Sequence, residues 1–257
     1  MKAVDNSGRV ALVTGGATGI GRAVCEALVE AGVGTVIVNY SKSADAAAEV
    51  VAALESRGAT AVAIQADIAD VASVETMVAQ VGDQFGRLDY LVNNAGITKL
   101  VPFAKLDDAT PDLWSALIDT NLLGAFWCSR AASTMLHANA GAIVNIASIA
   151  GTRAVGSSLP YGVSKAALLQ LTRSLAIALA PGIRVNAVSA GTVRSGWHEK
   201  LIGADAFEDK VLAESEVVPL KRLASPDDIA QAVVALLMLD FVTGENLLVD
   251  GGKSLLY

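Results

Sequence analysis

The chain has 257 residues, of which 53% are hydrophobic and 18% charged, and its formal net charge is −7. This length and composition exclude an intrinsically disordered protein, and the negative charge excludes a protein that binds nucleic acid through a basic surface. The two cysteines, Cys25 and Cys128, form no CxxC pattern, so we expect neither a disulfide framework nor a metal site. No signal-peptide pattern or membrane-spanning stretch is visible, and we expect a cytoplasmic protein without a membrane partner.

Short apolar runs alternate with Ala-rich amphipathic stretches along the chain. The runs that predict strands cover residues 10–14, 35–39, 61–66, 88–92, 142–147, 184–188 and 246–249. Helices are predicted from the glycine-rich residues 14–21 to residue 31, and over residues 44–57, 71–85, 111–136, 160–180 and 226–239. Only the long polar segment 190–225 interrupts the alternation. The pattern predicts one α/β domain over residues 1–257, with a doubly wound parallel sheet covered by helices on both faces.

Small and polar residues follow the carboxyl ends of the predicted strands. They are residues 15–21, Asn39, Asp67, Asn94, Ser148 and the residues from Ala190 onward. In a doubly wound sheet, ligands bind beyond the carboxyl ends of the strands, near the point where the strand order reverses. We therefore expect these residues to gather at one site.

The first of these segments, residues 14–21, has the sequence T-G-G-A-T-G-I-G. Small residues let the backbone approach a phosphate, and the helix that follows supplies N–H groups and a positive dipole. The loop therefore predicts a pyrophosphate site. Its G-x-x-x-G-x-G spacing differs from the common dinucleotide pattern, and a simple turn that opens the helix is the alternative.

Tyr161 and Lys165 are four residues apart, so they share one face of the predicted helix. Ser148 ends a predicted strand thirteen residues before Tyr161. An ammonium group favours a phenolate, so we expect Lys165 to lower the pKa of the phenol and to prepare it for proton transfer. For an isolated Y-x-x-x-K pattern, a core or surface tyrosine and a solvated lysine are the alternative. The upstream serine and the glycine-rich loop favour the catalytic interpretation.

Three further features complete the set: Asn93-Asn-Ala-Gly96, Asn121 and the terminal Asp250-Gly-Gly252. With these features, the chain resembles the short-chain dehydrogenase/reductase family over essentially its whole length, in the compact form of the 3-oxoacyl reductases. The resemblance implies a single-domain Rossmann-like three-layer sandwich with a seven-stranded sheet. It also implies NAD(P)-dependent interconversion of a ketone and a secondary alcohol, and a homotetramer built on two long helices.

The resemblance also implies roles for individual residues. Tyr161 is the general acid/base and Ser148 binds the substrate oxygen. Lys165 lowers the Tyr161 pKa and holds the nicotinamide ribose, while the backbone of Asn121 holds a water in the proton relay. The expected cofactor-binding residues are Gly15, Thr18, Gly19, Ile20, Gly21, Asn39, Tyr40, Ser41, Asp67, Ile68, Asn94, Ala95, Gly96, Tyr161, Lys165 and Val193. For Asp67, a helix N-cap is an equal alternative.

The end of the second predicted strand bears on the choice of cofactor. An acidic residue there would bind the adenosine ribose and repel a 2′-phosphate. This chain instead has Asn39-Tyr40-Ser41-Lys42, an amide, hydroxyls and an ammonium, which favour NADP(H). Thr18 stands where many NADP-using relatives carry Arg or Lys, so NAD(H) use stays open.

Residues 190–225 lie where the family places its substrate lid, and Trp197 and Phe207 there either wall an apolar pocket or anchor the segment. We expect an NADPH-preferring carbonyl reductase with a small-molecule ketone or alcohol as its substrate. A 3-oxoacyl-[acyl-carrier-protein] reductase is the alternative enzyme, although Thr134 and Ile177 stand where such reductases often carry basic residues. A non-catalytic NADP(H)-sensing protein is the alternative from another class.

Overall fold

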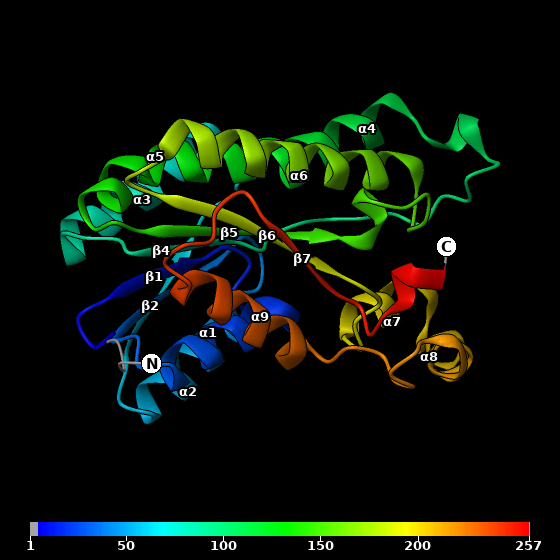
Figure 1. Cartoon of the computed structure of the whole chain (residues 1–257), viewed down its shortest axis with the longest axis horizontal. Helices are drawn as coiled ribbons and strands as arrows, with labels where there is room; N and C mark the ends of the chain where they lie inside the picture. The colour runs from blue at the N-terminus through cyan, green and yellow to red at the C-terminus, as the bar shows by residue number, and fades with distance from the viewer. Residues whose placement is uncertain (1–4, 257) are drawn as a thin grey trace.

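The computed structural model describes residues 5–256, with His198 described by its backbone alone. Seven strands form one sheet in the order β3-β2-β1-β4-β5-β6-β7, and every neighbouring pair is parallel (Figure 1). The strands are β1 (Val10–Val13), β2 (Thr35–Tyr40), β3 (Thr60–Gln65), β4 (Tyr90–Asn93), β5 (Ala142–Ser148), β6 (Arg184–Ala190) and β7 (Asn246–Val249). The predicted doubly wound, seven-stranded parallel sheet is confirmed.

Helices cover both faces of the sheet. The helices are α1 (Gly19–Glu30), α2 (Ala44–Ser56), α3 (Val71–Phe85), α4 (Pro111–Ile118), α5 (Gly124–Ala138), α6 (Leu159–Leu179), α7 (Gly196–Ile202), α8 (Ala204–Val217) and α9 (Pro226–Met238). Figure 1 shows α1, α2 and α9 on one face, α3 to α6 on the other, and α7 and α8 beyond one end of the strands. Within residues 5–256, no helix is both long enough and apolar enough to cross a membrane.

The sheet is buried on both sides, and β1 shows why its strands have continuous apolar sequences. All four residues of β1 are buried. Ala11 and Val13 belong to the core beneath α1, α2 and α9, whereas Val10 and Leu12 belong to the core beneath α3, α5 and α6. Successive side chains of a strand point to opposite faces, so a strand covered on both sides needs apolar residues at every position. Each large apolar side chain buried in this way contributes about 1.5–3 kcal/mol.

Two segments differ from the predicted elements. The helix expected over residues 111–136 contains a π-helical turn, Asp119–Leu123, between α4 and α5. The polar segment 190–225 is not a continuous loop, because it forms α7 and α8. Helix α8 is held by a small separate core in which Phe207 and Val211 pack with Val218 and Leu223. One apolar residue per turn is a weak periodic signal, which explains why the sequence did not predict this helix.

The register of the central strands positions the functional residues. Ser148, the last residue of β5, is the register partner of Ala190, the last residue of β6. Val13 of β1 lies level with Val92 of β4 in the same way. The segments that follow these strands therefore emerge at one edge of the sheet, as predicted from the alternation of strands and helices.

Candidate active site

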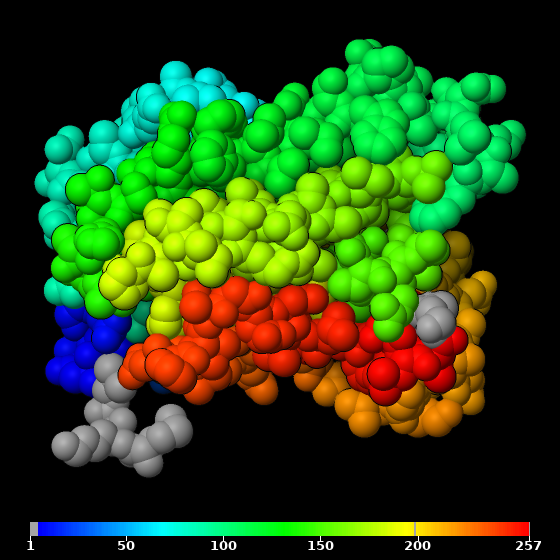
Figure 2. All heavy atoms as spheres, turned by 45° about the horizontal axis from the view of Figure 1, so that its top comes forward, coloured from blue at the N-terminus to red at the C-terminus, as the bar shows by residue number. Residues whose placement is uncertain are grey.

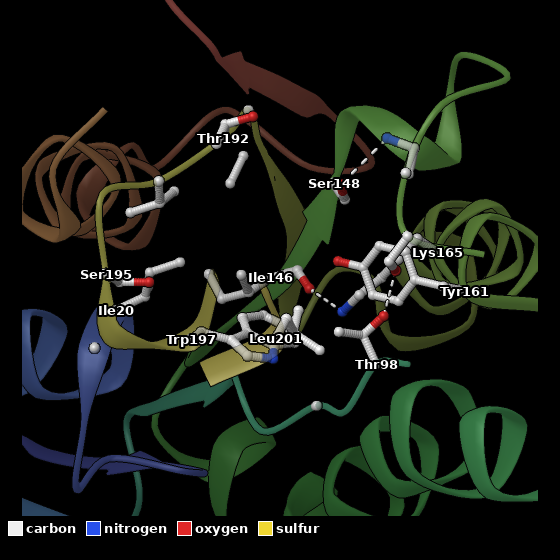
Figure 3. A pocket seen from close by; sticks show the side chains of 18 of the residues that line it. Ile20, Thr98, Ile146, Ser148, Tyr161, Lys165, Thr192, Ser195, Trp197 and Leu201 are labelled. Atoms are coloured by element: carbon white, nitrogen blue, oxygen red, sulfur yellow. Dashed lines mark hydrogen bonds between the residues drawn. The ribbon is translucent and has the colours of Figure 1, made fainter. Parts of the chain in front are cut away.

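A cavity of about 660 Å³ lies at the carboxyl ends of the central strands (Figure 3). In the view of Figure 3, Ser148, Tyr161 and Lys165 lie on one side, and Ile20 and Ser195 lie on the other. Trp197 and Leu201 reach in from α7. Of the predicted site residues, the cavity is lined by Gly15, Thr18, Gly19, Ile20, Asn94, Ala95, Gly96, Ser148, Tyr161, Lys165 and Val193.

Tyr161 is positioned by the start of α6. Ser158 is the N-cap of this helix, and its hydroxyl accepts a hydrogen bond from the Tyr161 backbone N–H at 3.4 Å. Pro160 occupies the first turn, where its missing N–H costs nothing. The cap fixes the first turn of the helix and therefore the point from which the phenol enters the cavity.

Lys165 lies one turn further along α6 and is 4% exposed. Its Nζ donates a hydrogen bond to the Ile146 carbonyl oxygen of β5 at 2.8 Å and lies 5.9 Å from the centre of the Tyr161 ring. The ammonium is thus fixed between the strand that ends at Ser148 and the helix that carries the phenol. The three predicted catalytic side chains do converge on one cavity.

The pKa values correct one expectation. Burial raises the Tyr161 pKa above its ordinary value, and an interaction with the Ser148 hydroxyl only partly opposes this effect. The expected net lowering by Lys165 is therefore wrong, because the buried phenolate loses more solvation than its neighbours return. Burial also lowers the Lys165 pKa to about 8. The phenol is therefore protonated at neutral pH, and Lys165 titrates near pH 8.

Asn121 lies in the π-helical turn and is buried. Its side chain accepts a hydrogen bond from the Ile97 N–H at 2.8 Å and donates to the Ile97 carbonyl at 3.0 Å. It also donates to the Ser164 hydroxyl at 3.1 Å. The side chain fixes the segment that follows β4, so only the backbone of Asn121 remains for the predicted water. Single π-helical turns inside α-helices are frequent at functional sites.

The glycine-rich loop fits a pyrophosphate. A Cβ built on Gly19 would meet no atom within 4 Å, whereas one on Gly21 would lie 2.2 Å from the Gly15 carbonyl oxygen. Gly21 therefore permits close packing of the loop, and Gly19 leaves open space at the cavity wall. Thr18, the N-cap of α1, forms no side-chain cap hydrogen bond, so the first N–H groups of this twelve-residue helix are left for a ligand.

Asn94 holds the glycine-rich loop against β4. Its side-chain amide donates to the Thr14 and Gly15 carbonyl oxygens, at 2.9 and 3.1 Å. The Thr14 hydroxyl in turn accepts from the backbone N–H groups of Asn94 and Ala95. Asn94 thus shapes the cavity through the loop as well as by lining its wall.

Asn39 does not offer its amide to a 2′-phosphate, which corrects that prediction. The residue is 1% exposed, and its amide nitrogen donates to the Ile64 and Ala66 carbonyl oxygens. Its side-chain oxygen accepts from the Gly15 N–H at 3.2 Å. Asn39 therefore positions the glycine-rich loop from behind.

The remaining predicted cofactor residues lie outside the lining of this cavity: Gly21, Tyr40, Ser41, Asp67 and Ile68. Ser41 is exposed after β2, and Ile68 is buried against Gly124, the first residue of α5. The Asp67 carboxylate accepts from the Ala69 N–H, but the N-cap of α3 is Asp70. The N-cap alternative for Asp67 is therefore wrong, although the residue does stabilise the turn before the helix.

The two aromatic residues of the lid have different positions. Trp197 lines the cavity and is 38% exposed, whereas Phe207 is 4% exposed in the small core of α8. The sequence left open whether these side chains wall a pocket or anchor the segment. Trp197 walls the pocket, and Phe207 anchors the segment.

Several residues that the sequence analysis did not single out also line the cavity. They include Thr98, Leu100, Ser157, Thr192, Ser195, Lys200, Lys210, Glu214 and Lys253. The Thr98 and Ser157 hydroxyls are hydrogen-bonded to each other across the cavity wall. Ser195 and Thr192 follow β6 and could have been predicted from that position. Lys253, at the other end of the sequence from β1, gave no such signal.

The sequence and the structure of this chain are similar to those of known reductases and dehydrogenases. The sequence profile of the family described as Enoyl-(Acyl carrier protein) reductase matches residues 15–254. The 3-oxoacyl-[acyl-carrier-protein] reductase of Synechocystis is 37% identical over 95% of this chain and 96% of its own. The reductase FabG of Staphylococcus aureus is 39% identical over 94% and 96%. A short chain dehydrogenase from Burkholderia cenocepacia, solved in complex with NADP, superposes with a TM-score of 0.86 at 36% identity, covering 97% and 99% of the two chains.

Proposed function

The chain belongs to the short-chain dehydrogenase/reductase family, and from this premise we propose that it reduces a small ketone to a secondary alcohol with NADPH as its preferred cofactor. It is an NAD(P)-dependent oxidoreductase that acts on CH–OH and C=O groups. The observation that carries the proposal is the convergence of Ser148, Tyr161 and Lys165 on one cavity that also contains the start of α1.

The residues of the cavity divide the chemistry among them. When bound, the nicotinamide supplies a hydride to the carbonyl carbon of the substrate. Negative charge then develops on the carbonyl oxygen, and hydrogen bonds from Ser148 and Tyr161 stabilise it. Tyr161 donates its proton to that oxygen, which completes the alcohol. Its raised pKa keeps the phenol protonated at neutral pH, as reduction requires.

Two sets of residues would hold the cofactor. The backbone N–H groups at the start of α1 and the loop before it would bind the pyrophosphate. Lys165, fixed on the Ile146 carbonyl, would hold the nicotinamide ribose through the N–H groups that this bond leaves over. The Asn121 backbone would hold a water molecule. Through Lys165, this water would return a proton to Tyr161.

Turnover of ketones with NADPH, followed at the nicotinamide absorbance, tests the proposal. We expect wild-type turnover on at least one member of a panel of small ketones. Tyr161→Phe should lower turnover by about 10²–10⁴-fold while the Kd for NADPH changes little, because only the proton donor is removed. Tyr90→Phe, at a buried tyrosine of β4, is the matched control. A wild type that binds NADPH but reduces no ketone would instead support the NADP(H)-sensing alternative.

The preference for NADPH rests on the segment after β2. Ser41 and Lys42 are exposed there, and no carboxylate stands in the stretch from Tyr40 to Lys42 to repel a 2′-phosphate. We expect kcat/KM for NADPH to exceed that for NADH, and Lys42→Glu to reverse the order by placing a negative charge at this position. Equal values for the two cofactors in the wild type would contradict the preference.

A second candidate, 3-oxoacyl-[acyl-carrier-protein] reductase, is supported by the names of the relatives in Synechocystis and Staphylococcus aureus. It requires that the chain reduce a 3-oxoacyl thioester attached to an acidic carrier protein. Comparing the kcat/KM values for acetoacetyl-carrier protein and for small ketones decides between the two. A much higher value for the thioester would favour this candidate.

A further inference from the structure

The charged residues of the cavity are mostly lysines. Lys165, Lys200, Lys210 and Lys253 line it, and Glu214 is its only carboxylate among the described residues. The chain as a whole carries a net charge of −7, so this local excess of positive charge runs against the overall balance. A cavity lined by one sign of charge concentrates ligands of the opposite sign.

Lys253 is the most buried of the lid-side lysines, with 8% of the residue exposed. It opens the short C-terminal turn Lys253–Leu256, and its Nζ donates to the Thr192 hydroxyl at 2.9 Å and to Glu214 Oε2 at 2.7 Å. The Asp250 carboxylate holds this turn by accepting from the Gly252 and Ser254 N–H groups. The ammonium is therefore fixed inside the cavity.

The C-terminal turn lies on the Ser148 side of the site. The Ser254 carbonyl oxygen accepts from the Arg153 guanidinium, at 3.3 Å, in the loop that follows Ser148. Figure 2 shows the C-terminal residues, in red, packed beside the region of α8, in orange. Thr192, the other partner of Lys253, follows β6 next to the predicted nicotinamide contact Val193. Lys253 thus lines the same cavity as the groups proposed to act on the carbonyl.

Glu214 is paired with two of the lysines. One of its oxygens accepts from Lys253, and the other lies 2.5 Å from the Lys210 ammonium. Burial raises the Glu214 pKa, but hydrogen bonds from Lys210, Lys253 and Thr192 bring it below its ordinary value, so the carboxylate stays charged. Asp250, directly after β7, also interacts electrostatically with Lys253, so two carboxylates face the two ammonium groups here. An ammonium has three N–H donors, and within the described residues Lys253 uses two of them.

We propose that Lys253 binds a carboxylate on the substrate, so that this enzyme reduces small keto acids in preference to their neutral esters or thioesters. This proposal rests on the proposed reduction of a ketone. A substrate carboxylate would accept a hydrogen bond from the third N–H of Lys253. A hydrogen bond in which both partners are charged is stronger than one to a neutral group, so the unused N–H favours a carboxylate over an ester.

The phosphates of the cofactor are a weaker explanation for Lys253. The pyrophosphate site predicted from the sequence is at the glycine-rich loop and the start of α1. The bonds of Lys253 run instead to the loop after β6 and to the lid, and its neighbour Ser254 is bonded to the loop after Ser148. These contacts place the ammonium with the substrate-side residues.

Three matched pairs of probes test the proposal: 2-oxobutanoate, 3-oxobutanoate and 4-oxopentanoate, each with its methyl ester. The ratio of kcat/KM for acid to kcat/KM for ester is measured with saturating NADPH. For at least one pair we expect the wild type to favour the acid by about 10- to 100-fold, the range of one hydrogen bond to a charged group. Lys253→Met should reduce that ratio at least tenfold, as expected from the same range, and Lys253→Arg should keep most of it.

Glu214→Gln separates recognition of the substrate from a merely structural ion pair. Because it removes a negative charge beside Lys253, it should raise the acid-to-ester ratio. If the Lys253–Glu214 ion pair only holds α8 in place, Glu214→Gln and Lys253→Met lower the activity on acid and ester by the same factor. Lys105→Met, at an exposed lysine outside the cavity, is the control that should leave the ratio unchanged.

Other outcomes overturn the proposal in distinguishable ways. Acid-to-ester ratios near one for all three pairs, or ratios unaffected by Lys253→Met, contradict carboxylate recognition while leaving ketone reduction intact. If Lys253→Met raises the KM for NADPH equally with acid and ester as substrates, Lys253 binds the cofactor instead. No oxidation of NADPH with any acid, ester or other ketone would remove the proposed function itself. Thermal unfolding of each variant checks that it is folded.

Discussion

The two ends of the cavity are built by different means. At the glycine-rich end, neutral amides hold the loop, because the Asn94 and Asn39 side chains are hydrogen-bonded to its backbone. Gly21, which has no side chain, lets the loop pack closely against itself. At the lid end, charged side chains from distant segments meet, as in the group of Lys210, Glu214 and Lys253. In our proposals, the neutral end binds the cofactor with its backbone, and the charged end distinguishes between substrates. Lys165 lies between them.

The largest effect is expected for Lys165→Met, which removes the charge between the two ends. Turnover should fall by about 10²–10⁴-fold, since the proton relay and the ribose contact are both lost. Stability should nevertheless rise: burial lowers the Lys165 pKa from 10.5 to about 8. Each pKa unit corresponds to about 1.4 kcal/mol, so we expect about 1–3 kcal/mol of added unfolding free energy at pH 7. Urea unfolding measures it; a loss of stability would mean that the bond to Ile146 outweighs burial.

Next in size is Gly21→Ala, which breaks the neutral end. The new methyl carbon would lie 2.2 Å from the Gly15 carbonyl oxygen and 2.5 Å from the Asn94 amide nitrogen, so the loop must move. We expect the Kd for NADPH, from fluorescence titration, to rise by about 10²-fold, equivalent to the 1–3 kcal/mol that overpacking usually costs. Gly8→Ala, at a site with nothing within 4 Å and without a left-handed backbone, controls for the substitution itself. Unchanged affinity in Gly21→Ala would show that the loop adjusts freely.

The pH dependence of cofactor use tests the lysine in the unmodified protein. As the pH rises through about 8, Lys165 loses its proton, so kcat/KM for NADPH should fall by about tenfold per unit. Tyr161, whose pKa is raised, stays protonated over this range. The unfolded chain binds more protons than the folded one between pH 8 and 10.5, so the contribution of Lys165 to stability increases with pH in that window. A flat kinetic profile up to pH 10 would contradict this assignment.

The smallest effect is expected for Glu208→Gln, which removes an ion pair of the lid outside the cavity. Glu208 pairs with Arg194, and both side chains are more than half exposed. Exposed pairs contribute about 0–1 kcal/mol, so unfolding free energy and kcat/KM should stay close to wild type. The comparison with Glu214→Gln sharpens the difference between a solvated lid charge and one that faces the cavity. A large loss in Glu208→Gln would mean that lid charges act together.

The features that the sequence predicted best have local signals. The strands could be recognised because both faces are covered, and Tyr161 and Lys165 because a helix places residues four apart on one face. The glycine-rich loop carries its own spacing. These features depend on neighbours within a few residues of each other.

What the sequence did not predict depends on the folded chain. Lys253 and Glu214 are 39 residues apart and meet only because α8 folds over the C-terminal turn. The raised Tyr161 pKa results from burial, which no spacing reveals. Asn39 was expected to bind a ligand, but it is hidden behind the glycine-rich loop because β3 lies alongside β2.

The hydrogen bonds from the Asn94 amide to the Thr14 and Gly15 carbonyl groups have a kinetic consequence. Since those oxygens are already engaged, the loop has its ligand-binding shape before a dinucleotide arrives. Association should then be a single step whose rate rises in proportion to dinucleotide concentration, with no slow ordering phase.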